Sequence, residues 1–454
     1  MKKVIVKSLT LLLAILTVFS LVACNGAKEQ SGIVNTSEIP KAEGKITFSY
    51  PAKTDTTRAA ADAFISAFND KYPNVKVEKD YAYEEAHFAN RISAGDIGDV
   101  FYMAESAVYT NAVKHNALMD LSYYITAFRI DRTDIYQGIY AAGQIGEGLY
   151  YVARDFNQMI MIYNKDAVDG SGVSEYVKED WTWDDFLEYV APALTNDQYY
   201  AASIDLSYDP VYVPMLSAEV GKNKWFDTVA GKVYLTGNDT ASLIGKLVEK
   251  HKLGEINVGL GNRDAFAGKE AVFTQGVYLG AEKLGQAYDM DFIPWDMMNL
   301  PLVANTDENP NKQYNSAFGC GSSGYGVYKR TKNPNAAAAF ALFFYEPAGQ
   351  TAFNGQTGGS VPVLSSLKDA DFWQHTNDVE HEWNEKNWGA NTYMAEQFAV
   401  IGQLQCLFPT EVADKFESTW KENLAYVVNN EMDLDDAMQK IETIVNQTWD
   451  NLKK

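Results

Sequence analysis

From Lys45 onward, short apolar runs alternate with longer segments in which apolar residues recur at helical spacing. Residues 46–50 form a run typical of a strand, and the apolar residues of segment 60–68 then fall on one face of a helix. Pro73 ends that helix, and a second strand is predicted at residues 75–77. A strand, a helix and a strand within about 35 residues predict a parallel sheet, with ligand sites beyond the carboxyl ends of its strands.

The same pattern continues to the end of the chain. Thr182 is a good N-cap for a helix that begins Trp181-Thr182-Trp183, and the two tryptophans are expected to pack in the core. Further strands are predicted at residues 100–103, 158–163 and 271–273, and further helices at residues 336–345, 412–427 and 433–449. We find no internal repeat and no low-complexity segment, so the sequence predicts an α/β protein.

The N-terminus predicts export. Lys2 and Lys3 precede an apolar run that ends at Ala23 and is shorter than the roughly 20 residues that a membrane-spanning helix needs. Its last residues, Leu21-Val22-Ala23-Cys24, resemble the lipobox of bacterial lipoproteins; an ordinary signal peptide with an incidental cysteine is the alternative. Residues 1–23 are therefore predicted to be a lipoprotein signal peptide, Cys24 the lipidated residue, and residues 24–44 a flexible linker.

Composition narrows the class of protein. The chain of 454 residues carries 38 Lys and Arg against 60 Asp and Glu, a net charge of −22, which argues against nucleic acid as a partner. A hydrophobic fraction of 46% excludes wholesale disorder, and the length suggests two or three domains. Aromatic residues make up 13%, and rings with polar tips suit partly wet binding surfaces.

The sequence lacks the signatures of several kinds of active site. No nucleophile-elbow pentapeptide, phosphate-binding glycine loop or His-Glu-x-x-His pair occurs, and the five scattered His predict no metal site and no cofactor. Cys320 and Cys406 are expected to be two separate buried thiols, although a disulfide between them stays open. The 60 acidic residues also leave open a pair of catalytic carboxylates for glycoside hydrolysis.

Several segments, taken together and in order, point to one family. Besides the lipobox they are residues 70–77, 94–100, 146–166, 181–186, 266–271 and 332–337. Through these segments the chain resembles the family 1 extracellular solute-binding proteins of bacterial ABC sugar importers, the maltose-binding-protein-like group. The likeness runs from about Lys45 to Leu452 and departs at Gly98, where the family commonly has proline, and at Tyr278, where tryptophan is frequent.

The resemblance implies a periplasmic-binding-protein-like fold of two α/β lobes. The hinge between them would be crossed near Arg154, within Ile293 to Leu302, and near Gly358-Gly359. The N-terminal lobe would hold residues 45–154 and 300–358, and the C-terminal lobe residues 155–299 and 359–454.

The function implied is that of a receptor without catalytic activity, a monomer held by its lipid on the extracellular face of the cytoplasmic membrane. It would capture a carbohydrate, an oligosaccharide, and deliver it to the permease subunits of an ABC transporter. The alternative is a secreted carbohydrate-active enzyme. The sequence names neither the sugar nor the permease.

The resemblance also implies ligand contacts, transferred position by position. They are Tyr50, Asp55, Tyr83, Glu84, Met103, Glu105, Asp155, Asn157, Asp205, Tyr208, Gln275, Tyr278, Trp295 and Ser322. Carboxylates and amides make directional hydrogen bonds to hydroxyls, whereas rings cover the apolar face of a pyranose. For Tyr278 and Trp295, packing in the core stays open as the alternative.

Overall fold

The computed structural model describes residues 39–108, 110–178, 180–220, 224–237, 239–259, 270–277, 295–303, 319–357, 361–370, 372 and 407–453. The chain divides after Ile39 into two units, and the described helices and strands all belong to the unit that begins at Pro40. The predicted signal peptide, Cys24, Cys406 and Tyr278 lie outside the described residues. Among the described residues, no helix is both long enough and apolar enough to cross a membrane.

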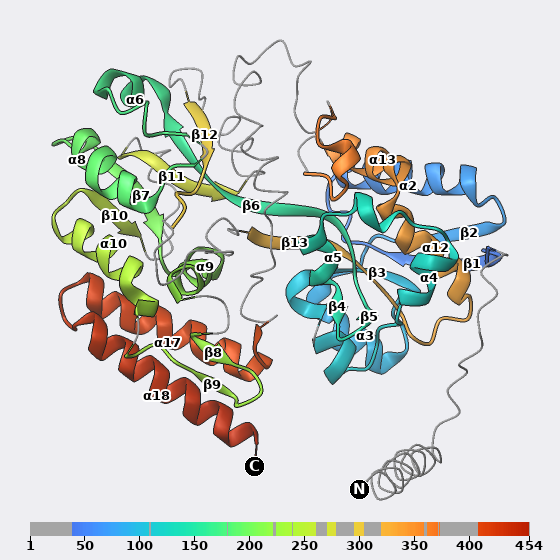
Figure 1. Ribbon diagram of the computed structural model, residues 1–454. Helices are drawn as coiled ribbons and strands as arrows, with labels where there is room; N and C mark the ends of the chain where they lie inside the picture. Colours follow the sequence, from blue (N-terminus) through green and yellow to red (C-terminus); the bar gives the residue numbers. More distant parts are fainter. Residues whose placement is uncertain are drawn as a thin grey trace, which may run out of the picture. The chain divides into compact units, whose positions relative to one another are not determined.

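A mixed sheet of nine strands runs through the described part of the chain, in the order β10-β7-β11-β6-β13-β3-β1-β2, with β12 paired to β6 (Figure 1). Its strands are β1 (Gly44–Ser49), β2 (Val75–Asp80), β3 (Val100–Ala104), β6 (Val152–Asn164), β7 (Tyr200–Asp205), β10 (Ile256–Gly259), β11 (Ala271–Val277), β12 (Trp295–Asn299) and β13 (Gly319–Val327). Strand β1 pairs in parallel with both β2 and β3, which confirms the parallel sheet predicted at the start of the chain. Two short hairpins are β4 (Gln144–Ile145) with β5 (Gly148–Leu149), and β8 (Phe226–Asp227) with β9 (Lys232–Val233).

Strand β6 is shared by both parts of the sheet. Its first half pairs with β13 as far as Gln158, and its second half pairs with β11 from Met159 and with β12 from Ile160. Figure 1 shows this strand passing from one group of helices to the other. The strand thus forms the first crossing between two lobes.

The first lobe packs helices on strands β1, β3 and β13. Thr54 caps α2 with a reciprocal capping box, and α2 ends at Lys71, as Pro73 predicts. Phe64 of α2 stacks on Phe344 at 3.7 Å between ring centroids, in an aromatic core. The helices of this lobe are α2 (Asp55–Lys71), α3 (Phe88–Ala94), α4 (Ser122–Ala127), α5 (Gln137–Ala142), α12 (Pro334–Leu342) and α13 (Pro347–Thr357), with the short turns η1 (Glu85–His87), η2 (Glu105–Ala107), η3 (Thr110–Lys114), η4 (Arg132–Asp134), η8 (Phe343–Tyr345) and η9 (Ser365–Leu367).

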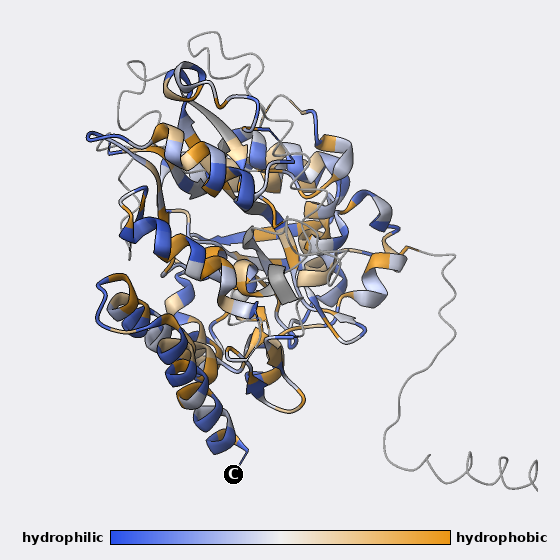
Figure 2. Cartoon of the chain, turned by 60° about the vertical axis from the view of Figure 1, so that its left-hand side comes forward, coloured by the Kyte–Doolittle hydropathy of each residue, from blue (hydrophilic) through white to orange (hydrophobic). Residues whose placement is uncertain are grey.

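The second lobe has its own core. Thr182 forms the predicted cap, and Trp181 and Trp183 are buried, which confirms that they pack in the core. Figure 2 shows hydrophobic and hydrophilic residues alternating along the C-terminal helices, as expected for helices that bury one face. The helices are α6 (Lys165–Ser171), α7 (Trp183–Asp185), α8 (Ala191–Leu194), α9 (Asp209–Val220), α10 (Ser242–Lys252), α17 (Thr410–Val428) and α18 (Leu434–Leu452), with η5 (Phe186–Val190) and η6 (Asp239–Ala241).

The structure confirms the two-lobed α/β fold, with a separate core in each lobe. Leu300 and Val303 belong to the second core, and Tyr325 and Val327 of β13 belong to the first. Val361, Val363 and Leu364 belong to the first core, and Phe408 and the C-terminal helices belong to the second. The positions predicted for the second and third crossings stay predictions.

Candidate functional site

Strand β6 contains a bulge at Arg154. Ser323 of β13 faces Asp155, while the next residue, Gly324, faces Ala153, so Arg154 has no partner in the β13 ladder. Neighbouring residues in a regular strand point to opposite faces, but a bulge re-aims a side chain. Here it brings together two successive residues: Nη2 and Nε of Arg154 lie 2.6 and 2.8 Å from Oδ2 of Asp155.

The first lobe holds this bulge from both sides. The carbonyl oxygen of Arg154 accepts hydrogen bonds from Nε2 of Gln350 at 2.7 Å and Nδ2 of Asn354 at 3.2 Å, both buried on α13. On the other side, a Cβ at Gly324 would lie 2.2 Å from the carbonyl oxygen of Val152, so the close approach of the two strands requires glycine. The bulge is thus built into the packing of β13 and α13.

Aromatic rings surround the guanidinium of Arg154. Its Cζ atom lies 4.9, 5.9 and 6.0 Å from the ring centroids of Phe353, Tyr102 and Tyr50, and its Nη1 donates to the hydroxyl of Tyr50 at 3.3 Å. Burial acts to lower the pKa of Arg154, but Asp155 and the neighbouring tyrosines outweigh it and hold that pKa well above its usual value. For a tyrosine the charged form is the deprotonated one, so burial raises the pKa of Tyr50 and of Tyr102. Both tyrosines therefore stay protonated at neutral pH.

Two further acids are fixed beside this pair. Oε2 of Glu105 accepts from the backbone N–H of Ser322 at 2.9 Å and from its hydroxyl at 3.0 Å. Glu85 accepts from the N–H of Ala104 at 2.8 Å, and burial raises its pKa. We call the residues gathered at this crossing the hinge cluster: Tyr50, Tyr102, Glu105, Arg154, Asp155, Ser322 and Ser323.

The structure brings four predicted contacts into the hinge cluster but buries them. Tyr50, Glu105, Asp155 and Ser322 retain 5% exposure or less, and Met103, also predicted, is fully buried. Their neighbours Tyr102, Arg154 and Ser323, which the sequence reasoning missed, are partly exposed. Neighbouring side chains of a strand point to opposite faces, so Tyr102 and Met103 of β3 cannot both face solvent. This alternation is the feature of the sequence that could have indicated Tyr102 as the exposed residue.

The remaining predicted contacts of the first lobe lie around its first loops. Asp55 is exposed in the first turn of α2, where it pairs with Arg58 at 3.0 Å. The ring of Tyr83 is buried under the guanidinium of Arg91, 5.4 Å from its centroid. Glu84 is half exposed and lies 3.6 Å from the ammonium of Lys53 and 3.8 Å from the ring of His87.

In the second lobe, Asp205 and Gln275 come together at the ends of neighbouring strands. The N–H of Asp205 donates to Oε1 of Gln275 at 2.9 Å, and both side chains are buried. Nε2 of Gln275 is a buried donor without a hydrogen-bond partner in the described part of the chain. Tyr208 packs against the second core.

For two of the predicted contacts, Asn157 and Trp295, the structure describes the backbone but not the side chain. Asn157 lies in β6 opposite Gly321, and Trp295 opens β12 opposite Asn164. Among the described residues, no three His, Cys, Asp or Glu side chains gather in a way that could hold a metal ion.

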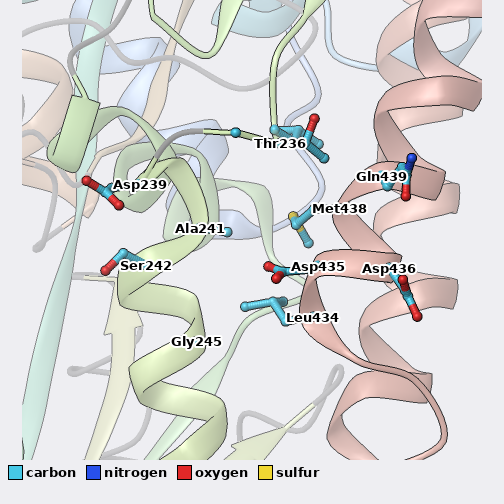
Figure 3. A pocket seen from close by; sticks show the side chains of 12 residues that line it. Thr236, Asp239, Ala241, Ser242, Gly245, Leu434, Asp435, Asp436, Met438 and Gln439 are labelled. Carbon is cyan, nitrogen blue, oxygen red and sulfur yellow. The ribbon is translucent and has the colours of Figure 1, made fainter.

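A cavity of about 670 Å³ lies elsewhere in the second lobe, between η6, α10 and α18. Figure 3 shows Leu434, Asp435 and Met438 extending from α18 toward Ala241. The lining includes no predicted ligand contact; it consists of Leu235, Thr236, Gly237, Asp239, Ala241, Ser242, Gly245, Leu434, Asp435, Asp436, Met438 and Gln439.

Comparisons with known proteins agree with this architecture. The family model of bacterial extracellular solute-binding proteins matches residues 59–381. The sugar-binding protein MalE from Xanthomonas citri superposes with a TM-score of 0.69 at 16% identity, over 90% of this chain and 98% of that one.

Two further solved structures share the fold. An ABC substrate-binding protein from Listeria monocytogenes, in complex with cycloalternan, gives 0.63 at 18% identity over 89% of this chain and 99% of that one. UgpB from Mycobacterium tuberculosis, in complex with glycerophosphocholine, gives 0.66 at 16% identity over 91% and 100%. At such identities the likeness establishes the fold, whereas the ligand has to be argued from the site.

Proposed function

Because the chain belongs to the bacterial extracellular solute-binding proteins, we propose that it is a receptor that captures an oligosaccharide between its two lobes and delivers it to an ABC transporter permease. The observation that carries this proposal is the hinge cluster, whose central pair Arg154 and Asp155 lies on β6, the strand that both lobes share. Rings and hydrogen-bonding groups at a hinge allow one ligand to be buried by both lobes, which couples binding to closure.

The chemistry of the cluster favours a sugar. The exposed parts of Tyr102 and Arg154 offer a ring and planar donors, and Ser323 adds a hydroxyl 3.3 Å from that of Tyr102. The buried donor of Gln275 offers a further hydrogen bond from the second lobe. Two of the similar structures are named as a sugar-binding protein and as a complex with cycloalternan, which supports the same ligand class.

A melting screen against oligosaccharides tests the proposal. Maltotriose, cellotriose, xylotriose, galactotriose and raffinose are added to the purified chain, and at least one should raise the melting temperature. At 100 times its dissociation constant, a ligand contributes about 2.7 kcal/mol of stability. Chromatography of the mixture should return the sugar intact. A panel without any stabilising sugar, or cleavage of the sugar that binds, would contradict the proposal.

We also propose that Cys24 carries a lipid that anchors the receptor to the outer face of the cytoplasmic membrane, because the Leu21-Val22-Ala23-Cys24 junction resembles a lipobox. Cells expressing the protein are fed an alkyne-tagged fatty acid. The wild-type protein should be labelled and the Cys24→Ser variant should not. Equal labelling of both would exclude the lipid anchor.

Tyr278 is proposed as a ring against the sugar, since it directly follows the last residue of β11, three residues after Gln275. Tyr278→Ala should weaken binding by about 1–3 kcal/mol, or about 5- to 150-fold, whereas Tyr278→Phe keeps the ring and should be nearly neutral. Calorimetric titration measures the affinity and melting of the ligand-free variants measures stability. Unchanged affinity with a sharply lower melting temperature would mean that Tyr278 packs in the core.

A further inference from the structure

The cation of the hinge cluster, Arg154, is partly exposed and already paired. The side chain of Arg154 is 12% exposed, whereas that of its partner Asp155 is 1% exposed. The side chain of Arg154 is therefore more accessible to a ligand than the side chain of Asp155. The guanidinium lies against the partly exposed ring of Tyr102, so an apolar ring face and planar donors are presented side by side.

The guanidinium retains donors for a ligand. An arginine carries five N–H groups. Among the described residues, Asp155 takes up two through Nε and Nη2, the hydroxyl of Tyr50 takes up one through Nη1, and the hydroxyl of Tyr325 also interacts with the guanidinium. The packing fixes the direction of the remaining N–H groups, because Phe353 and Tyr50 hold the guanidinium plane.

The charges around Arg154 disfavour an anion. Asp155 compensates the guanidinium directly, and the buried Glu105 accepts hydrogen bonds from Ser322, the residue before Ser323, which itself bonds to Asp155. The whole chain carries a net charge of −22. An anionic ligand would lose its hydration on binding and gain little from a cation that is already neutralised. A neutral hydroxyl can accept hydrogen bonds from the remaining N–H groups of Arg154 without the cost of removing a charge from water.

From this geometry we infer that Arg154 contacts the ligand directly and that its pairing with Asp155 selects neutral sugars over acidic sugars of the same backbone. The inference rests on the proposed function and adds the ligand class. The backbone of Arg154 is held separately, by Gln350 and Asn354, so its side chain can be changed while the anchors of the bulge remain.

The test compares neutral and acidic forms of the same sugar on the full chain. The probes are galactotriose with trigalacturonic acid, xylotetraose with its glucuronic-acid-substituted form, and maltotriose and cellotriose with their 6-carboxylate derivatives. Calorimetry should give at least about 10-fold tighter binding of the neutral member. In Asp155→Asn the guanidinium loses its counter-charge, and the neutral-to-acidic ratio should fall by about 10-fold or more.

Asp99→Asn is the matched control. It makes the same substitution in the first lobe. Asp99 precedes the first residue of β3, at the opposite end from the hinge cluster, and accepts hydrogen bonds from the N–H of Thr47 and the hydroxyl of Thr331. This variant should keep the wild-type ratio. A ratio that falls equally in both variants would mean that overall charge, and not the pair, sets the preference, and would overturn the inference.

Arg154→Lys provides an independent test that does not depend on the folding of Asp155→Asn. It keeps the charge beside Asp155 but removes the fixed fork of donors, so binding of the neutral sugar should weaken by about 10-fold while the melting temperature changes little. Wild-type preference for the acidic member, or unchanged affinity in Arg154→Lys, would overturn the inference and leave the proposed function intact. Binding of no sugar at all would overturn both.

Discussion

Arg154→Leu should lower the free energy of unfolding by about 3–5 kcal/mol, because it leaves Asp155 buried without its counter-charge. Asp155 is 1% exposed, and its other carboxylate oxygen accepts a long hydrogen bond, from the N–H of Ser323 at 3.2 Å. The lost contacts with Phe353 and Tyr102 add to the cost. Urea denaturation of the ligand-free variant measures the change.

The double variant Arg154→Leu/Asp155→Leu is the control. It removes the stranded carboxylate, so it should recover part of the stability that the single variant loses. If the single variant were as stable as the wild type, the pair would not be buried in solution as it is in the structure.

Gly324→Ala should cost about 1–3 kcal/mol of unfolding free energy. The added Cβ would lie 2.2 Å from the carbonyl oxygen of Val152 and 2.7 Å from the ring of Tyr151, so β13 and β6 would have to separate at the bulge. Gly170→Ala is the control, since Gly170 is exposed in α6 and its Cβ would meet no atom within 4 Å. Equal stability of the two variants would contradict the close approach of the strands.

The parts of the fold that the sequence predicts are those with local causes. Pro73 stops α2 through its own backbone, and Thr182 caps its helix with Asp185 three residues later. Both effects act within one turn and can be recognised in a single segment. The burial of Trp181 and Trp183 follows from the same local pattern.

The extent of β6 had no such local cause. The prediction began the strand at residue 158, but the structure begins it at Val152, because the polar segment Arg154 to Gln158 is held as a strand by β13. That partner lies far along the chain, so the segment taken alone is not typical of a strand. The bulge depends on Gly324, Gln350 and Asn354 in the same way.

The candidate site likewise has features that the sequence indicates and features that depend on distant parts of the chain. Four of the contacts that the resemblance implies, Tyr50, Glu105, Asp155 and Ser322, lie together in the hinge cluster, and their role as ligand contacts stays a prediction. Which residue of each neighbouring pair faces solvent is set by strand register and by the bulge, and a shift of one residue exchanges the faces. For that reason the sequence did not indicate that Tyr102 and Arg154 are the partly exposed members of the cluster.

Solution X-ray scattering of the Cys24→Ser chain, titrated with the oligosaccharide that raises its melting temperature most, tests most directly whether ligand is captured between two lobes. Strand β6 joins the lobes, and two further connections between them are predicted. Closure about these connections should therefore reduce the radius of gyration. Capture between the lobes predicts a decrease that saturates at the same sugar concentration as calorimetric binding. A radius of gyration that stays unchanged while calorimetry shows the site to be full would contradict it.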